Sequence, residues 1–262
     1  MNEKTSDAHC HLFDLFKLFP EAETERRNLG VLCAGSAWNL EDFLYQEKLK
    51  HQALQDGGPR ILCCFGVHPQ MPALKRDQQV SEATALLESL AEQRRLDGVG
   101  ETGFDLFDQQ FRATETIQER LFARHLSIAL SYDLPLILHV RKALPKIFAQ
   151  GKILKRLRAV IFHAYPGGLS EGEALLRRGI NVYFSFGNAV ILGRKESQRA
   201  GAGLPGDRIL TETDAPYQKL RGTGFSCWRD LGPLRESLTR LRVSGGNSLP
   251  SLDANFRRAY GI

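Results

Sequence analysis

The chain has 262 residues, of which 42% are apolar and 25% are charged. This composition is typical of a folded protein with a sizeable core and excludes disordered and collagen-like chains. The formal net charge is +5, and the segment 219–262, with eight basic and three acidic side chains, carries the whole excess. A basic end of this kind can attract a polyanion, although a solvated helical face is the simpler interpretation.

The five cysteines contain no C-x-x-C pair, which excludes a disulfide scaffold and a structural zinc module. No apolar stretch approaches the length that spans a bilayer, and no secretory core follows the polar N-terminus. We therefore expect a cytoplasmic protein without membrane association or an obligate protein partner, acting as a monomer or weak oligomer.

Short apolar runs alternate with longer amphipathic stretches along the chain. The runs predict eight strands, at 6–11, 30–35, 60–67, 98–103, 134–140, 159–164, 181–186 and 208–213. Helical patterns lie between them: one that Asn39 caps, one over 83–96, one through 117–132 that includes His125, and one ending at Gly179. Nearly continuous apolar runs suit parallel strands that are covered on both faces.

This alternation predicts an α/β fold, a single (β/α)8 barrel over residues 1–262. An open, doubly wound sheet is the alternative. No glycine-rich nucleotide-binding motif follows any predicted strand, which disfavours the nucleotide-binding versions of that sheet. In a barrel, the C-terminal ends of the strands form the mouth of the active site, so polar residues at those ends are the candidates for catalysis.

Two motifs lie at the first and fourth strands. His9 and His11 alternate along a strand and therefore point the same way, so they can chelate one cation, although a chance pair is equally compatible. Glu101 lies between Gly100 and Gly103, which let the chain turn tightly at the expected strand end. Its carboxylate can bridge two cations, or cap a helix, or form an ion pair.

Further polar residues end the later strands. His139 and His163 follow apolar runs, and each alone is more often a core residue than a ligand. Asp214 lies before Pro216 at the eighth strand, where it can bind a metal or accept a proton, or belong to a turn. Glu212 shares its strand face and can hold a ligand or a water.

Together these positions supply four imidazoles and two carboxylates. Nitrogen and oxygen donors without thiolate suit zinc, manganese or, less well, magnesium. Six donors exceed the need of one open site, and two divalent cations about 3.5–4 Å apart would use them all. We predict such a centre, with the metal ligands His9, His11, Glu101, His139, His163 and Asp214.

The series of motifs at 7–12, 66–69, 99–105, 134–141, 161–165 and 210–216 resembles the TatD family of metal-dependent hydrolases and deoxyribonucleases, in the amidohydrolase-like barrel group. The resemblance implies that His9 and His11 hold one metal with Asp214, that His139 and His163 hold the other, and that Glu101 lies between them. It also makes Asp214 the base, and places three residues near the substrate: His68, Asp105 and Arg141. The alternative roles are orienting a loop for His68, capping a helix for Asp105 and forming a salt bridge at the rim for Arg141.

The sequence departs from the family after Pro216, with one clear helix near 234–242 and a short end where the family has a longer pair. We expect a metal-dependent deoxyribonuclease that cleaves DNA phosphodiester bonds with water activated by two metals, using Asp214 and Glu101 as catalytic residues. Arg141 and the basic segment would hold the polyanion. A two-metal hydrolase of a small ester, lactone or amide is the alternative. A barrel that has lost catalysis is a third hypothesis, and the complete ligand set argues against it.

Overall fold

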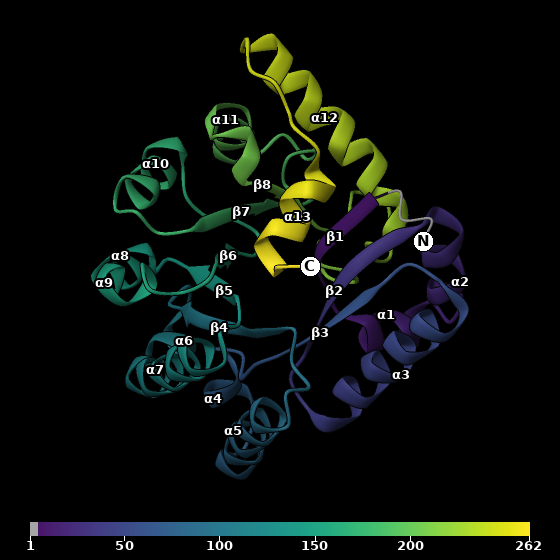
Figure 1. Cartoon of the computed structure of the whole chain (residues 1–262). Coiled ribbons are helices and arrows are strands. Elements are labelled where there is room, and N and C mark those ends of the chain that lie inside the picture. Colours follow the sequence, from purple (N-terminus) through teal and green to yellow (C-terminus); the bar gives the residue numbers. More distant parts are fainter. Residues whose placement is uncertain (1–4) are drawn as a thin grey trace.

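The computed structural model describes residues 5–262. Its centre is one sheet of eight parallel strands that pair in chain order, with the helices around it (Figure 1). The arrangement confirms the (β/α)8 barrel and excludes the doubly wound sheet. The strands are β1 (Thr5–Cys10), β2 (Val31–Ala37), β3 (Ile61–Phe65), β4 (Gly98–Asp105), β5 (Leu136–Arg141), β6 (Val160–Phe162), β7 (Val182–Phe186) and β8 (Ile209–Thr211).

Hydrogen bonds between β1 and the segment after β8 bring the two edges of the barrel together. The backbone N–H of Asp214 donates to the carbonyl of His9 at 2.9 Å, and that of His11 donates to Ala215 at 2.7 Å. The buried carboxylate of Asp7 accepts from the backbone N–H and the hydroxyl of Thr213, at 3.0 and 2.6 Å. This seam therefore places His9 and His11 beside Asp214, which is some two hundred residues away along the chain.

The helices follow the strands and cover the outside of the sheet. Asn39 caps α3 as predicted, because its side-chain oxygen accepts from the N–H of Asp42 at 3.0 Å. No helix within residues 5–262 combines the length and the apolar character needed to cross a bilayer. The α-helices are α1 (Leu12–Leu18), α2 (Ala22–Leu29), α3 (Leu40–Asp56), α4 (Met71–Leu74), α5 (Asp77–Glu92), α6 (Gln109–Arg112), α7 (Glu115–Tyr132), α8 (Leu144–Ala149), α9 (Gly151–Leu154), α10 (Leu169–Arg177), α11 (Lys195–Gly203), α12 (Leu231–Ser244) and α13 (Leu252–Tyr260).

The C-terminal part differs from the prediction, because it forms two helices rather than one helix and a short end. Helix α13 lies over the centre of the barrel (Figure 1). Its side chains Phe256 and Tyr260 pack among the inward-facing residues of the strands, and the hydroxyl of Tyr260 donates to the carbonyl of Ala8 at 2.9 Å. Asn255 donates to the carbonyl of Ile209, where β8 begins. Helix α13 therefore closes the N-terminal end of the barrel, opposite the active-site mouth.

Part of the basic segment 219–262, which we expected to hold the polyanion, forms contacts within the fold. Arg229 pairs with Glu25 at 2.6 Å, and Arg235 pairs with Asp253 at 3.0 Å. The buried Arg242 donates to the carbonyls of Gly201 and Leu204 at the end of α11 and to the carbonyl of Ser248 before α13. Arg229, Arg235 and Arg242 therefore take part in tertiary contacts that stabilise the fold and that the composition does not reveal.

Candidate metal centre

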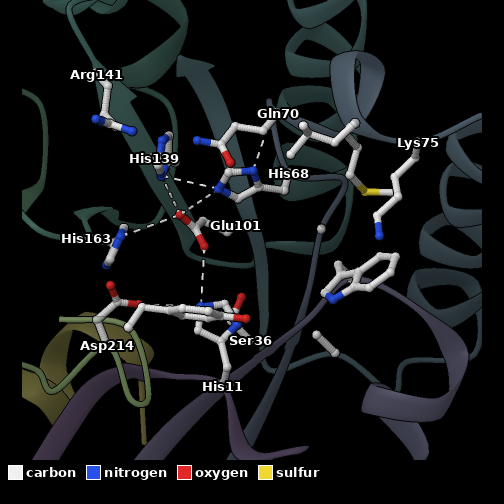
Figure 2. Close-up of a pocket in the computed structure, with 16 residues that line it drawn as sticks. His11, Ser36, His68, Gln70, Lys75, Glu101, His139, Arg141, His163 and Asp214 are labelled. Carbon is white, nitrogen blue, oxygen red and sulfur yellow. Dashed lines mark hydrogen bonds and ion pairs between the residues drawn. The ribbon is translucent and has the colours of Figure 1, made fainter. Parts of the chain in front are cut away.

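A cavity of about 530 Å³ opens at the C-terminal ends of the strands. The predicted polar side chains converge at this cavity from five different strands or the segments just after them. Figure 2 shows those that line it: His11, Glu101, His139, His163 and Asp214. The structure thus brings together all six expected ligands: His9, His11, Glu101, His139, His163 and Asp214.

Glu101 occupies the middle of this cluster. Its Oε2 lies 3.3 Å from Nε2 of His9 and 3.8 Å from Nε2 of His11. Its Oε1 lies 2.7 Å from Nδ1 of His139 and 3.5 Å from Nε2 of His163. The two oxygens of one buried carboxylate therefore face two different sets of imidazoles, as a bridging ligand does.

The two glycines near Glu101 do not form the turn that the sequence predicts, because β4 continues to Asp105. They permit close approach of neighbouring backbones instead. A Cβ on Gly103, whose φ is +136°, would lie 2.2 Å from the carbonyl oxygen of His139. A Cβ on Gly66, at the end of β3, would lie 2.5 Å from the carbonyl oxygen of Glu101. Only glycine at these two positions lets β4, which carries Glu101, approach this closely to β5 on one side and to the end of β3 on the other.

Asp214 completes the cluster from the β8 side. Its φ of +50° is uncommon for a residue with a side chain, and the hydrogen bond that it donates to His9 holds it there. Its Oδ1 lies 3.4 Å from Nε2 of His11 and 3.7 Å from Nε2 of His9. The ring of Tyr217 packs edge-on against His11, with 5.0 Å between centroids, and covers this side of the cluster.

Two further buried carboxylates lie behind the histidines. Oδ2 of Asp105 lies 3.1 Å from Nε2 of His139, and Oε1 of Glu212 lies 3.0 Å from Nδ1 of His163. Each therefore faces the ring nitrogen that points away from Glu101. Carboxylates in this position orient metal-binding histidines and make them more basic.

His68 also lies beside Oε1 of Glu101, the oxygen that faces His139, and its surroundings determine which ring nitrogen carries the proton. Its Nδ1 accepts a hydrogen bond from the backbone N–H of Gln70 at 3.2 Å, and burial lowers its pKa. A neutral ring with an accepting Nδ1 carries its proton on Nε2. That Nε2 lies 3.3 Å from Oε1 of Glu101 and faces the cavity, so it is placed to donate a hydrogen bond.

The charges of the cluster shift its titration strongly. Burial opposes ionisation of Glu101, but the nearby His68, His163 and His9 outweigh it and hold the pKa well below the usual range. Burial likewise opposes the charged form of His163, but Glu212, Glu101 and Asp214 raise its pKa to about 10. The carboxylates of the centre are therefore ionised and available to a cation.

The donors fit a divalent metal. Three sets of side chains place their ligand atoms within 4.8 Å of one another: His9, His163 and Asp214; His9, His11 and Glu101; His68, Glu101 and His139. All are nitrogen or oxygen donors, and the five cysteines are buried and free. The first two sets share His9, and the last two share Glu101. His163 groups with His9 and Asp214 in these sets, although its Nε2 also lies 3.5 Å from Oε1 of Glu101, the oxygen that faces His139.

Arg141 lies at the rim, where the resemblance places it. Its side chain is exposed, its guanidinium stacks 4.2 Å from the centroid of Phe107, and Nη1 lies 3.4 Å from Oδ2 of Asp105. Trp38, Lys75 and other residues that were not predicted from the sequence also line the cavity. Trp38 directly follows β2, so the rule that identified the histidines, residues at strand ends, would also have found it.

A parallel eight-stranded barrel with imidazoles and carboxylates converging at its mouth is the architecture of a metal-dependent hydrolase. The model of the family described as TatD related DNase matches residues 6–228, and the chain belongs to this family.

Individual relatives agree with this placement. An uncharacterized metal-dependent hydrolase, YjjV of Escherichia coli, is 30% identical over 223 residues, which cover 82% of this chain and 81% of the relative. A 3'-5' ssDNA/RNA exonuclease TatD of Citrobacter koseri is 31% identical over 199 residues, covering 72% of this chain and 68% of that protein. The crystal structure of YjjV from Escherichia coli superposes with a TM-score of 0.81 at 26% identity, with both chains fully covered.

Proposed function

We propose that the protein is a deoxyribonuclease that uses two divalent metal ions to hydrolyse phosphodiester bonds. The observation that carries this proposal is the position of Glu101, whose two oxygens face separate groups of histidines at 2.7–3.8 Å. A single ion does not need a carboxylate that divides its oxygens in this way. The name of the Citrobacter relative supports nucleic acid as the substrate class.

The proposal assigns His9, His11 and Asp214 to one ion and His139 and His163 to the other, with Glu101 between them. Bound ions would lower the pKa of water and neutralise phosphate oxygens. Zinc, manganese and magnesium are the candidate ions. The carboxylate of Asp214 would accept the proton of the attacking water, because it is ionised and lines the cavity.

Other residues act around the centre. His68 donates a hydrogen bond from Nε2 to a phosphate oxygen, and the guanidinium of Arg141 donates hydrogen bonds to the phosphate from the rim. Asp105 is fully buried behind His139, so we assign it the orientation of that ring in place of the substrate contact expected from the sequence. Glu212 holds His163 in the same manner.

The test combines metal analysis with hydrolysis assays. We expect two ions per chain, loss of cleavage of an end-labelled DNA oligonucleotide after EDTA treatment, and recovery when a divalent ion is returned. Glu101→Gln removes the bridging charge and should lower kcat/KM by more than about 100-fold. The exposed Glu196→Gln on α11 is the matched control and should behave as the wild type.

Three outcomes contradict the proposal. Full activity in metal-free protein excludes metal-dependent chemistry, and a single ion per chain excludes the two-metal centre. Turnover of small esters, lactones or amides with DNA left intact would identify the alternative hydrolase on the same centre.

A further inference from the structure

The wall of the cavity formed by the end of β2 and the end of α4 carries two residues that the metal centre does not use. The ammonium of Lys75 lies over the indole of Trp38, 4.3 Å from its ring centroid. Both side chains are half-buried and line the cavity, together with Met71 and Leu74. In Figure 2, Lys75 and Arg141 stand on either side of His68.

Two cationic side chains, Lys75 and Arg141, line this cavity, and they differ in whether a carboxylate lies beside them. Arg141 lies 3.4 Å from the carboxylate of Asp105. Lys75 has no carboxylate partner among residues 5–262, and its ammonium contacts the indole face of Trp38. A half-buried aromatic face with an unneutralised cation beside it suits a ligand that has both a flat π-system and an adjacent negative charge. A nucleotide combines these two groups.

We propose that Trp38 and Lys75 form a nucleotide subsite, in which the indole stacks on one nucleobase of the substrate and Lys75 binds the neighbouring phosphate. This inference rests on the proposed action on nucleic acid. A cation over an aromatic ring at an exposed site shifts an equilibrium about 2- to 5-fold, whereas a base stacked on an aromatic side chain contributes about 5- to 150-fold. A nucleobase therefore displaces Lys75 from the indole, and the phosphate gives the released ammonium a partner.

The recessed position of Trp38 has a consequence for the substrate. Neighbouring bases cover both faces of a base in a duplex, so such a base cannot stack on an indole inside a cavity without leaving the duplex. The subsite accordingly selects single-stranded segments or frayed ends, whose bases are already unstacked.

The first measurement uses the fluorescence of the two tryptophans. Trp228 is 1% exposed, and its indole N–H donates to the carbonyl of Ala22, so it serves as an internal reference. The protein as isolated is titrated with phosphorothioate hexathymidylate, which resists hydrolysis, and with an abasic hexamer that has the same backbone. We expect quenching by hexathymidylate and little change with the abasic hexamer. In Trp38→Leu the quenching should disappear.

The second measurement is the anisotropy of labelled hexathymidylate with variant proteins. Trp38→Leu should raise Kd about 5- to 150-fold, while Trp38→Phe keeps a stacking face and should recover most of the affinity. Lys75→Gln should weaken the hexathymidylate and the abasic hexamer equally and reduce the salt dependence by about one phosphate contact. Lys195→Gln, an exposed lysine at the start of α11, is the matched control.

The results separate this inference from the proposed function. Equal binding of the two hexamers, or unchanged affinity in Trp38→Leu with metal-dependent DNA cleavage intact, overturns the subsite and leaves the nuclease proposal standing. If neither hexamer binds and DNA is not cleaved, both proposals fail. Circular dichroism of each variant confirms that a lost signal does not reflect unfolding.

Discussion

Replacing Asp105 by Asn tests how the protein holds the ring of His139. Oδ2 of Asp105 lies 3.1 Å from Nε2 of His139 and accepts from the side-chain amide of Gln70 at 2.7 Å. The carboxylate is 0% exposed, and although burial favours its protonated form, the bonds from His139 and Gln70 lower its pKa to about 2. Asp105 is therefore an ionised acceptor that an amide cannot fully replace.

Two independent magnitudes agree on the size of this effect. A hydrogen bond to a charged group contributes about 1.5–3 kcal/mol, which corresponds to roughly 10- to 150-fold. Removing a partner of a metal-binding histidine typically costs about 10- to 100-fold in metal affinity or activity. We therefore expect Asp105→Asn to weaken metal binding by about 10- to 100-fold.

The assay is competition for the metal against a chelator of known affinity, followed by kcat/KM at saturating metal. Asp108→Asn is the matched control, because Asp108 caps α6 only three residues away and Asn is an equally good cap. Wild-type metal affinity in Asp105→Asn would refute the reasoning, because the carboxylate would then have no influence on the ring that it contacts.

Three further predictions concern stability. Burial lowers the pKa of His125 to about 4, so the free energy of unfolding should fall by up to about 3 kcal/mol between pH 6.5 and pH 4, and His125→Gln should remove this part of the pH dependence in urea titrations. Phe256→Ala should destabilise the protein by about 3–5 kcal/mol in the same titrations without changing metal affinity, because α13 closes the opposite end of the barrel. Gly103→Ala should cost about 1–3 kcal/mol and also weaken metal binding, because its Cβ meets the carbonyl of His139.

Each stability prediction has its own check. The sign for His125 follows from its neutral folded form: below pH 6.5 the unfolded chain takes up a proton that the folded chain does not, so an identical pH slope in His125→Gln would contradict it. Metal affinity that falls together with stability in Phe256→Ala would contradict the separation of the two barrel ends. Gly232→Ala, in α12 with open space around its Cβ, is the control for Gly103→Ala and should be neutral or stabilising.

The sequence alone determined the architecture and the set of candidate ligands that the structure brings together. The alternation of apolar runs with amphipathic stretches is a local property, and the eight runs correspond to β1–β8 with ends that differ by a few residues. The ligands were also locally readable, because strands of a parallel barrel all end at one mouth, so polar residues that follow apolar runs must converge there. His139 and His163 illustrate this, since Leu138 pairs with Phe162 and each histidine comes directly after its paired apolar residue, His139 within β5 and His163 just after β6.

Only the tertiary structure decided how these residues are supported. The contact of Asp105 with His139, the contact of Glu212 with His163, and the placement of Lys75 over Trp38 each join segments separated by tens of residues. Such pairs depend on the register between strands and on the paths of the loops, which no local pattern specifies. The same reason explains why the glycines near Glu101 read as a turn in the sequence, although they serve the close approach of β4 to β5.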